Sequence, residues 1–101
     1  MIIERNTFRL KFGKAKESIA LWKEIMEDAK KHENPPQMRM MTDLSGTSYT
    51  LVVEMMLKSF MDINPKNYVW VTNPVTQDLY HRFIPLCDSA TREYYKIEME
   101  I

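Results

Sequence analysis

The sequence predicts an α+β fold in which the elements follow the order β-α-β-β-α-β. Two stretches of alternating apolar and polar residues, 2–12 and 92–101, open and close the chain. Between them lie two amphipathic helical patterns, with a strand pair between the helices. This order is that of the ferredoxin-like split βαβ motif, whose four strands form one antiparallel sheet. Because such folds carry many unrelated functions, the fold alone predicts no chemistry.

The first strand and the first helix follow from two different periodicities. Phe8, Leu10 and Phe12 alternate with charged residues and are expected on the buried face of a strand. Gly13 ends this strand, and apolar residues then recur at spacings of three and four over 14–32, as in an amphipathic helix. The expected buried stripe consists of Ala15, Ile19, Trp22, Ile25, Met26 and Ala29.

The hairpin that follows is predicted from two strands, 38–42 and 47–58, and the turn-forming residues 43–46 between them. In the second strand both faces are apolar. One face holds Leu51, Val53, Met55 and Leu57, and the other holds Val52 and Met56. Two helices on the same side of the sheet can cover only one face, so we expect a second copy of the chain to cover the other.

The second helix has the clearest start signal of the chain. Asn73 offers an N-cap and Pro74 suits the first helical position. Before it, 59–72 predicts irregular helical turns that Pro65 interrupts. The expected buried stripe of this helix consists of Val75, Leu79, Phe83 and Leu86. The last strand is expected over 92–101, with Tyr95, Ile97, Met99 and Ile101 on one face.

Length and composition restrict the functional classes. A chain of 101 residues fits one domain, 1–101. The 14 basic and 14 acidic residues balance and form no basic stripe, so no nucleic-acid partner is expected. No apolar run approaches the roughly 18 residues of a membrane span, and the first residues lack the core of a signal peptide. We therefore expect no membrane partner and a cytoplasmic location.

The run 8–17, Phe-Arg-Leu-Lys-Phe-Gly-Lys-Ala-Lys-Glu, and the following Leu21-Trp22 resemble the opening of NIPSNAP-type domains. These domains place a strand, a glycine-lysine turn and a long helix with an aromatic residue in this order. The later runs 73–75, 80–86 and 92–95 are compatible with the same superfamily, the dimeric α+β barrels. The resemblance implies this fold and a homodimer. The superfamily includes haem-degrading and quinone-forming monooxygenases, isomerases, ligand-sensing domains and many proteins without assigned function.

Asn6 is the first candidate functional residue, because it shares a strand face with Phe8 and Leu10 and a buried amide needs hydrogen-bond partners. The haem-degrading members are similar here, since they carry an asparagine seven residues before a glycine, as Asn6 precedes Gly13. They also carry a tryptophan and a histidine, roles that Trp70 and His81 could fill. This resemblance implies Asn6, Trp70 and His81 as candidate catalytic residues. Helix geometry, however, places His81 nearly opposite the apolar stripe, as a surface or interface residue.

Three function hypotheses remain open. The first is a small-molecule-binding protein or cofactor-independent enzyme that acts on an apolar or aromatic compound between sheet and helices. Its pocket walls would come from Tyr49, Tyr68, Tyr80 and Phe83, with Trp70 beside them. The second is a haem-degrading monooxygenase, and the third is a non-catalytic homodimeric assembly module. Two distant histidines and one cysteine give no metal-binding pattern. No cofactor is the simplest expectation, and haem is the cofactor that the resemblance implies.

Overall fold

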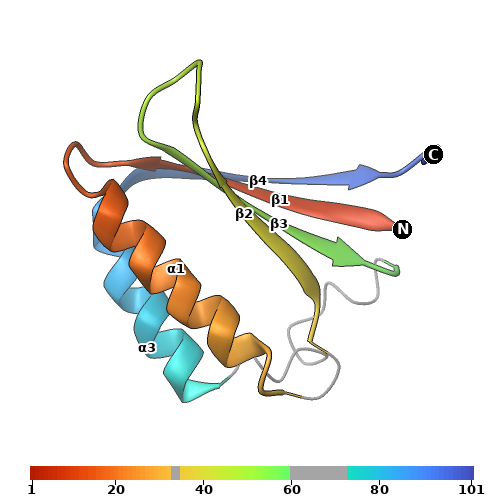
Figure 1. Cartoon of the computed structure of the whole chain (residues 1–101), viewed down its shortest axis with the longest axis horizontal. Helices are drawn as coiled ribbons and strands as arrows, with labels where there is room; N and C mark the ends of the chain where they lie inside the picture. Colours follow the sequence, from red (N-terminus) through yellow and green to blue (C-terminus); the bar gives the residue numbers. More distant parts are fainter. Residues whose placement is uncertain (33–34, 60–72) are drawn as a thin grey trace.

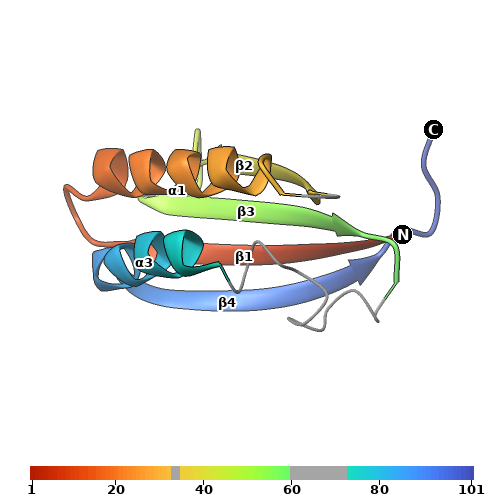
Figure 2. The ribbon, with the colours of Figure 1, turned by 90° about the horizontal axis from the view of Figure 1, so that it is seen from below.

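The computed structural model describes residues 1–32, 35–59 and 73–101, and their strands form one sheet with helices on a single face (Figures 1 and 2). The sheet order is β2-β3-β1-β4, and every neighbouring pair is antiparallel. The strands are β1 (Ile2–Leu10), β2 (Gln37–Thr42), β3 (Thr50–Leu57) and β4 (Cys87–Lys96). The helices are α1 (Ala15–Ala29), α3 (Pro74–Phe83) and the short η3 (Ile84–Leu86). The predicted ferredoxin-like α+β fold is confirmed.

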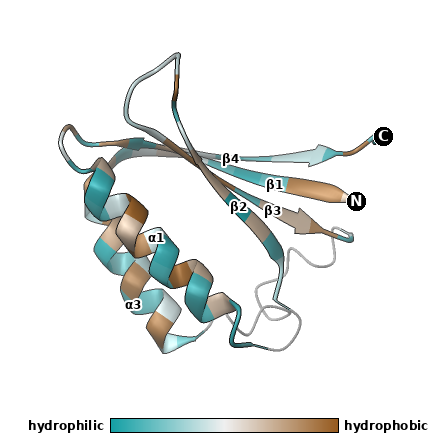
Figure 3. Cartoon of the chain, in the orientation of Figure 1, coloured by the Kyte–Doolittle hydropathy of each residue, from teal (hydrophilic) through white to brown (hydrophobic). Residues whose placement is uncertain are grey.

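The core lies between the helices and the sheet and is built around three aromatic rings. Phe83 of α3 meets Phe8 of β1 edge-on, with ring centroids 4.9 Å apart, and lies 5.5 Å from the ring of Trp22 of α1. Along both helices hydrophobic and hydrophilic residues alternate (Figure 3), as amphipathic helices on one sheet face require. The helix-facing residues of β3, namely Leu51, Val53, Met55 and Leu57, are all buried as predicted.

Two predicted core residues are exposed. Phe12 lies beyond the end of β1 and is 88% exposed, because the chain already turns toward Gly13, whose φ is +79°. Its ring packs on Tyr49 instead, with centroids 5.3 Å apart. Val75 is 53% exposed, because Thr76 takes the buried position. The Thr76 hydroxyl donates to Asp28 at 3.1 Å, which satisfies it against α1.

The remaining points at which prediction and structure are compared lie at the ends of helices and strands. The predicted N-cap is confirmed, since Asn73 Oδ1 accepts the backbone N–H of Val75 at 2.9 Å. β4 begins at Cys87, earlier than expected, and ends at Lys96, which pairs with Ile2 at the start of β1. The expected strand over 97–101 is therefore wrong. The irregular turns expected over 59–72 lie, from residue 60 on, outside the described residues.

The face of the sheet that carries no helix, here called the open face, is more polar than predicted. Val52 and Met56 of β3 are half-buried there, but Glu54 lies between them and is only 2% exposed. The prediction that both faces of this strand are apolar is wrong for the open face. A buried carboxylate must be paired, and the adjacent strands supply its partners.

Candidate functional site

A group of four polar side chains lies on the helix-facing side of β1 and β4. Glu4 and Asn6 share this side of β1 with the core residue Phe8. The strand register pairs Asn6 with Arg92 of β4, and Glu4 with Tyr94. We call Glu4, Asn6, Arg92 and Tyr94 the polar network. It occupies positions at which the neighbouring strands carry core residues.

Hydrogen bonds connect all four members of the polar network. Asn6 Nδ2 donates to Glu4 Oε2 at 3.2 Å, and its Oδ1 accepts from Arg92 Nε at 2.9 Å. The hydroxyl of Tyr94 donates to Glu4 Oε1 at 3.0 Å, and Arg92 Nε lies 4.0 Å from the same oxygen. Donors thus surround the carboxylate of Glu4, whose side chain is 12% exposed. This satisfies a charge that burial would otherwise destabilise.

The polar network has a sheltered end, formed by Glu4 and Tyr94, and an accessible end at Arg92. Burial, together with the hydrogen bond to the Glu4 carboxylate, raises the pKa of Tyr94, so its hydroxyl stays a donor at neutral pH. The side chain of Arg92 is 59% exposed, so its guanidinium is open to a further oxygen ligand. The arrangement can therefore bind an oxygen group at Arg92, with the Glu4 carboxylate as a hydrogen-bond acceptor beside it.

The residues predicted from sequence are only partly brought together. Asn6 lies on the predicted face, but its partners are side chains of β1 and β4. Phe83 is fully buried in the aromatic core, where its ring packs on Phe8 and Trp22. Tyr80 is half-buried and lies edge-on to Trp22, with ring centroids 6.1 Å apart. Tyr49 lies near the far end of β1, where its carbonyl accepts the N–H of Leu10.

Of the other two catalytic candidates, the structure describes His81. His81 is exposed on α3, in the position that helix geometry indicated. A haem ligand needs a sheltered imidazole that reaches the iron, which this exposed position does not favour. Trp70 and the pocket candidate Tyr68 lie outside the described residues. Among the residues that are described, no group of three metal-binding side chains comes together.

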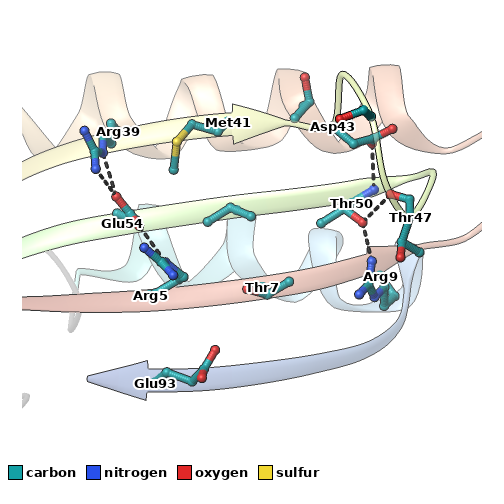
Figure 4. Close-up of a pocket in the computed structure, with 13 residues that line it drawn as sticks. Arg5, Thr7, Arg9, Arg39, Met41, Asp43, Thr47, Thr50, Glu54 and Glu93 are labelled. Atoms are coloured by element: carbon teal, nitrogen blue, oxygen red, sulfur yellow. Dashed lines mark hydrogen bonds and ion pairs between the residues drawn. The ribbon is translucent and has the colours of Figure 1, made fainter. Parts of the chain in front are cut away.

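A hollow of about 540 Å³ lies on the open face, where the sequence predicted no site (Figure 4). Its floor is formed by side chains of all four strands, and residues of the β2–β3 turn form one end. In Figure 4, Arg5 and Arg39 flank Glu54, and Arg9 points to the hydroxyl of Thr50. The alternation of Arg5, Thr7 and Arg9 along β1 was the sequence signal for a polar face here.

Glu54 is the centre of this open face. Arg5 Nε lies 2.6 Å from its Oε2, and Arg39 Nη2 lies 2.6 Å from its Oε1. Burial acts to raise the pKa of Glu54, but the hydrogen bonds and charges of the two arginines outweigh it and hold this pKa below its ordinary value. The carboxylate therefore stays ionised in the folded protein at neutral pH.

In the described part of the chain, the helices are too short and too polar to cross a membrane. No protein-family model and no curated protein sequence matches the chain.

Solved structures, in contrast, match over nearly the whole chain. An uncharacterised NIPSNAP domain protein from Burkholderia xenovorans is 17% identical with a TM-score of 0.80, over 96% of this chain and 94% of that one. A NIPSNAP family protein of unknown function from Agrobacterium tumefaciens is 18% identical with a TM-score of 0.79, over 96% and 87%. SnoaB, a cofactor-independent oxygenase from Streptomyces nogalater, is 7% identical with a TM-score of 0.74, over 99% and 95%. The chain therefore has the ferredoxin-like α+β fold of the NIPSNAP domain proteins, as its sequence resemblance implied.

Proposed function

We propose that this chain is a homodimeric domain that binds an apolar or aromatic small molecule with an oxygen substituent, without a cofactor. The observation that carries this proposal is the polar network, a connected carboxylate, amide, guanidinium and phenol on a sheet face that otherwise builds the core. Apolar side chains would stabilise the fold at least as well at these positions. A few polar groups placed among apolar residues are typical of a small-molecule site.

Each member of the polar network has a distinct role in this function. Arg92 binds the oxygen of a phenol, enol or carbonyl through its accessible guanidinium. Asn6 holds Arg92 in place through the 2.9 Å hydrogen bond to Nε. Glu4, held in place by the hydroxyl of Tyr94, offers its carboxylate as a hydrogen-bond acceptor to the hydroxyl of a phenol or enol. Binding through these side chains requires no cofactor, in line with the cofactor-independent oxygenase SnoaB.

The homodimer is supported by the open face. Helices cover only one face of the sheet (Figure 2), yet Ile3, Val52 and Met56 are half-buried apolar residues on the other. A second copy would bury them. A dimer that forms through this face leaves the polar network, on the opposite face, free to bind its ligand.

A binding screen tests the proposed function. The parent protein and Arg92→Leu are titrated with phenols, hydroquinones and naphthoquinols, with thermal shift and calorimetry as readouts. Arg82→Leu is the matched control, because Arg82 is an exposed arginine of α3 that pairs with Asp78. We expect saturable binding that Arg92→Leu weakens by about ten- to a hundredfold, the value of a charge-assisted hydrogen bond of about 1.5–3 kcal/mol. Arg82→Leu should bind like the parent.

Two results would count against this function. If none of the compounds binds, or if Arg92→Leu binds them as well as the parent, the polar network is a structural feature and the chain fits the non-catalytic assembly module better. Haemin is included as a separate arm. Saturable haemin binding that His81→Ala abolishes would favour the haem-degrading alternative.

A further inference from the structure

A row of alternately charged side chains crosses the open face of the sheet. The registers place Arg5 of β1 beside Glu93 of β4 and Glu54 of β3. Arg39 of β2 lies beside Glu54 on its other side. We call Glu93, Arg5, Glu54 and Arg39 the charged row. From β4 to β2 its signs are negative, positive, negative and positive, one charge on each strand.

The rows on either side carry no charge, which confines the alternation to one line. On one side the register aligns Tyr95, Ile3, Met56 and Gln37. On the other side it aligns Thr91, Thr7, Val52 and Met41. The next charge on the open face of β1 is Arg9, which bonds to the hydroxyl of Thr50. Glu100, beyond the end of β4, lines a small hollow with Ile3 and Met56 next to Arg39 and Glu54. On the strands themselves, the open face offers a second surface one line of charges between two uncharged lines.

The order of these charges matters when two copies pack face to face. A two-fold axis parallel to the strands reverses the strand order, so β4 faces β2 of the partner and β1 faces β3 of the partner. Glu93 then faces the partner's Arg39, and Arg5 faces the partner's Glu54. A two-fold axis along the charged row would instead place every residue opposite its own copy, and like charges would meet throughout.

We propose that the charged row orients the homodimer, with the two-fold axis parallel to the strands and each charge opposite the partner's counter-charge. This inference rests on the proposed homodimer and deepens it, with a second copy of the chain as the occupant of the open face. Such an interface is isologous and self-complementary. Ions that lose water in an interface need opposite charges nearby, and like charges held together there exclude the wrong arrangement. The row supplies opposite charges both within each chain and across the dimer.

The outer members of the row provide a charge-exchange experiment. Glu93 is exposed, and the side chain of Arg39 is 65% exposed, so both positions tolerate substitution better than Glu54. In Glu93→Lys each new lysine faces the partner's Arg39, and in Arg39→Glu each new glutamate faces the partner's Glu93. When the two variants are mixed, the new lysine of one chain faces the new glutamate of the other. The remaining native pair, Arg39 of the first chain and Glu93 of the second, also face each other. Mixing thus restores every opposite-charge pair across the interface.

Sedimentation velocity and native mass spectrometry measure the outcome. We expect each variant alone to dimerise at least about tenfold more weakly than the parent, and the equimolar mixture to recover a mixed dimer of near-parent strength. Lys23→Glu and Glu24→Lys, on exposed positions of α1, are the charge-matched controls and should dimerise like the parent. Thermal unfolding verifies that each variant is folded.

A second measurement does not depend on Arg39→Glu, which also removes an ion pair of Glu54. A mixed dimer of the parent and Glu93→Lys has one unfavourable pair in place of two, so its dissociation constant should lie between those of the two pure dimers. The orientation is wrong if the parent dimerises but Glu93→Lys does so equally well, or if mixing the two variants forms no mixed dimer. A parent that is monomeric at micromolar concentration overturns both the orientation and the homodimer.

Discussion

Glu54→Gln removes the charge at the centre of the open face while keeping the size of the side chain. The carboxylate accepts hydrogen bonds from Arg5 and Arg39 and is buried, with a side chain only 3% exposed. In the variant one amide oxygen still accepts from one arginine, but the amide N–H₂ points a donor at the other. One charge-assisted hydrogen bond is lost outright and the second is weakened.

The size of the stability loss depends on how well water can replace the hydrogen bonds that Arg5 and Arg39 lose. Removing one partner of a fully buried ion pair costs about 3–5 kcal/mol, because the other charge is left unpaired in the interior. In a single chain Arg5 is 40% exposed and Arg39 is 65% exposed, so in the monomer both arginines can be hydrated after the substitution. For the monomer, at a protein concentration below the dimer dissociation constant, we therefore expect a loss of about 2 kcal/mol in the free energy of unfolding at neutral pH, near one charge-assisted hydrogen bond.

The pH dependence of this loss distinguishes electrostatics from packing. The folded pKa of Glu54 lies below its ordinary value, so its contribution is present above the unfolded pKa of about 4.3 and is lost as the pH falls through the folded pKa. The difference between parent and variant should be constant from pH 7 to about 5 and should shrink below about 4.3. Urea unfolding at a series of pH values measures it, with Glu24→Gln on α1 as the exposed control. A difference below about 0.5 kcal/mol at pH 7, which is near the error of such measurements, would refute the reasoning. A difference that persists unchanged at pH 3 would refute it as well.

Two further substitutions test the helix-facing side. Asn6→Leu removes a hydrogen-bond donor from Glu4 and an acceptor from Arg92, and water can replace the acceptor at the exposed guanidinium. We therefore expect a stability loss of about 1 kcal/mol and weaker phenol binding. A loss above about 3 kcal/mol with unchanged binding would remove Asn6 from the site. Trp22→Phe should cost about 1–2 kcal/mol in urea unfolding, from lost ring volume alone, because the buried indole Nε1 has no hydrogen-bond partner among the described residues. A larger loss would mean that this N–H has an acceptor in solution.

The fold was predictable because it depends on local periodicities. The alternation in β1, the stripes of α1 and α3, and the N-cap at Asn73 are each visible within about 15 residues of sequence. Errors occurred at element ends, where the apolar pattern continues past the buried part of the element, as at Phe12 and Val75. There, the turn at Gly13 and the hydrogen bond between Thr76 and Asp28 decide which side chain is buried.

The polar sites were less predictable because they depend on strand register. Asn6 was identified as a polar residue on an apolar face, but its partner Arg92 lies 86 positions away in the chain. Likewise, Arg5 meets Glu54 across 49 positions. A one-residue shift in register would move each side chain to the other face, so no local pattern indicates such a pair. Glu54, within the apolar strand β3, and the alternation of Arg5, Thr7 and Arg9 along β1 were the local signs that the open face is not a simple apolar surface.

Adjacent residues of β4 separate the two proposed functions. Arg92 belongs to the polar network and Glu93 to the charged row, and successive side chains of a strand point to opposite faces. Arg92→Leu should therefore weaken ligand binding and leave the dimer dissociation constant unchanged, whereas Glu93→Lys should weaken the dimer and leave the ligand affinity of the remaining dimer unchanged. Ligand titrations and sedimentation on the same two samples measure both quantities. If either substitution changes both, the two faces of the sheet are energetically coupled, and ligand binding and dimerisation cannot be assigned to separate faces.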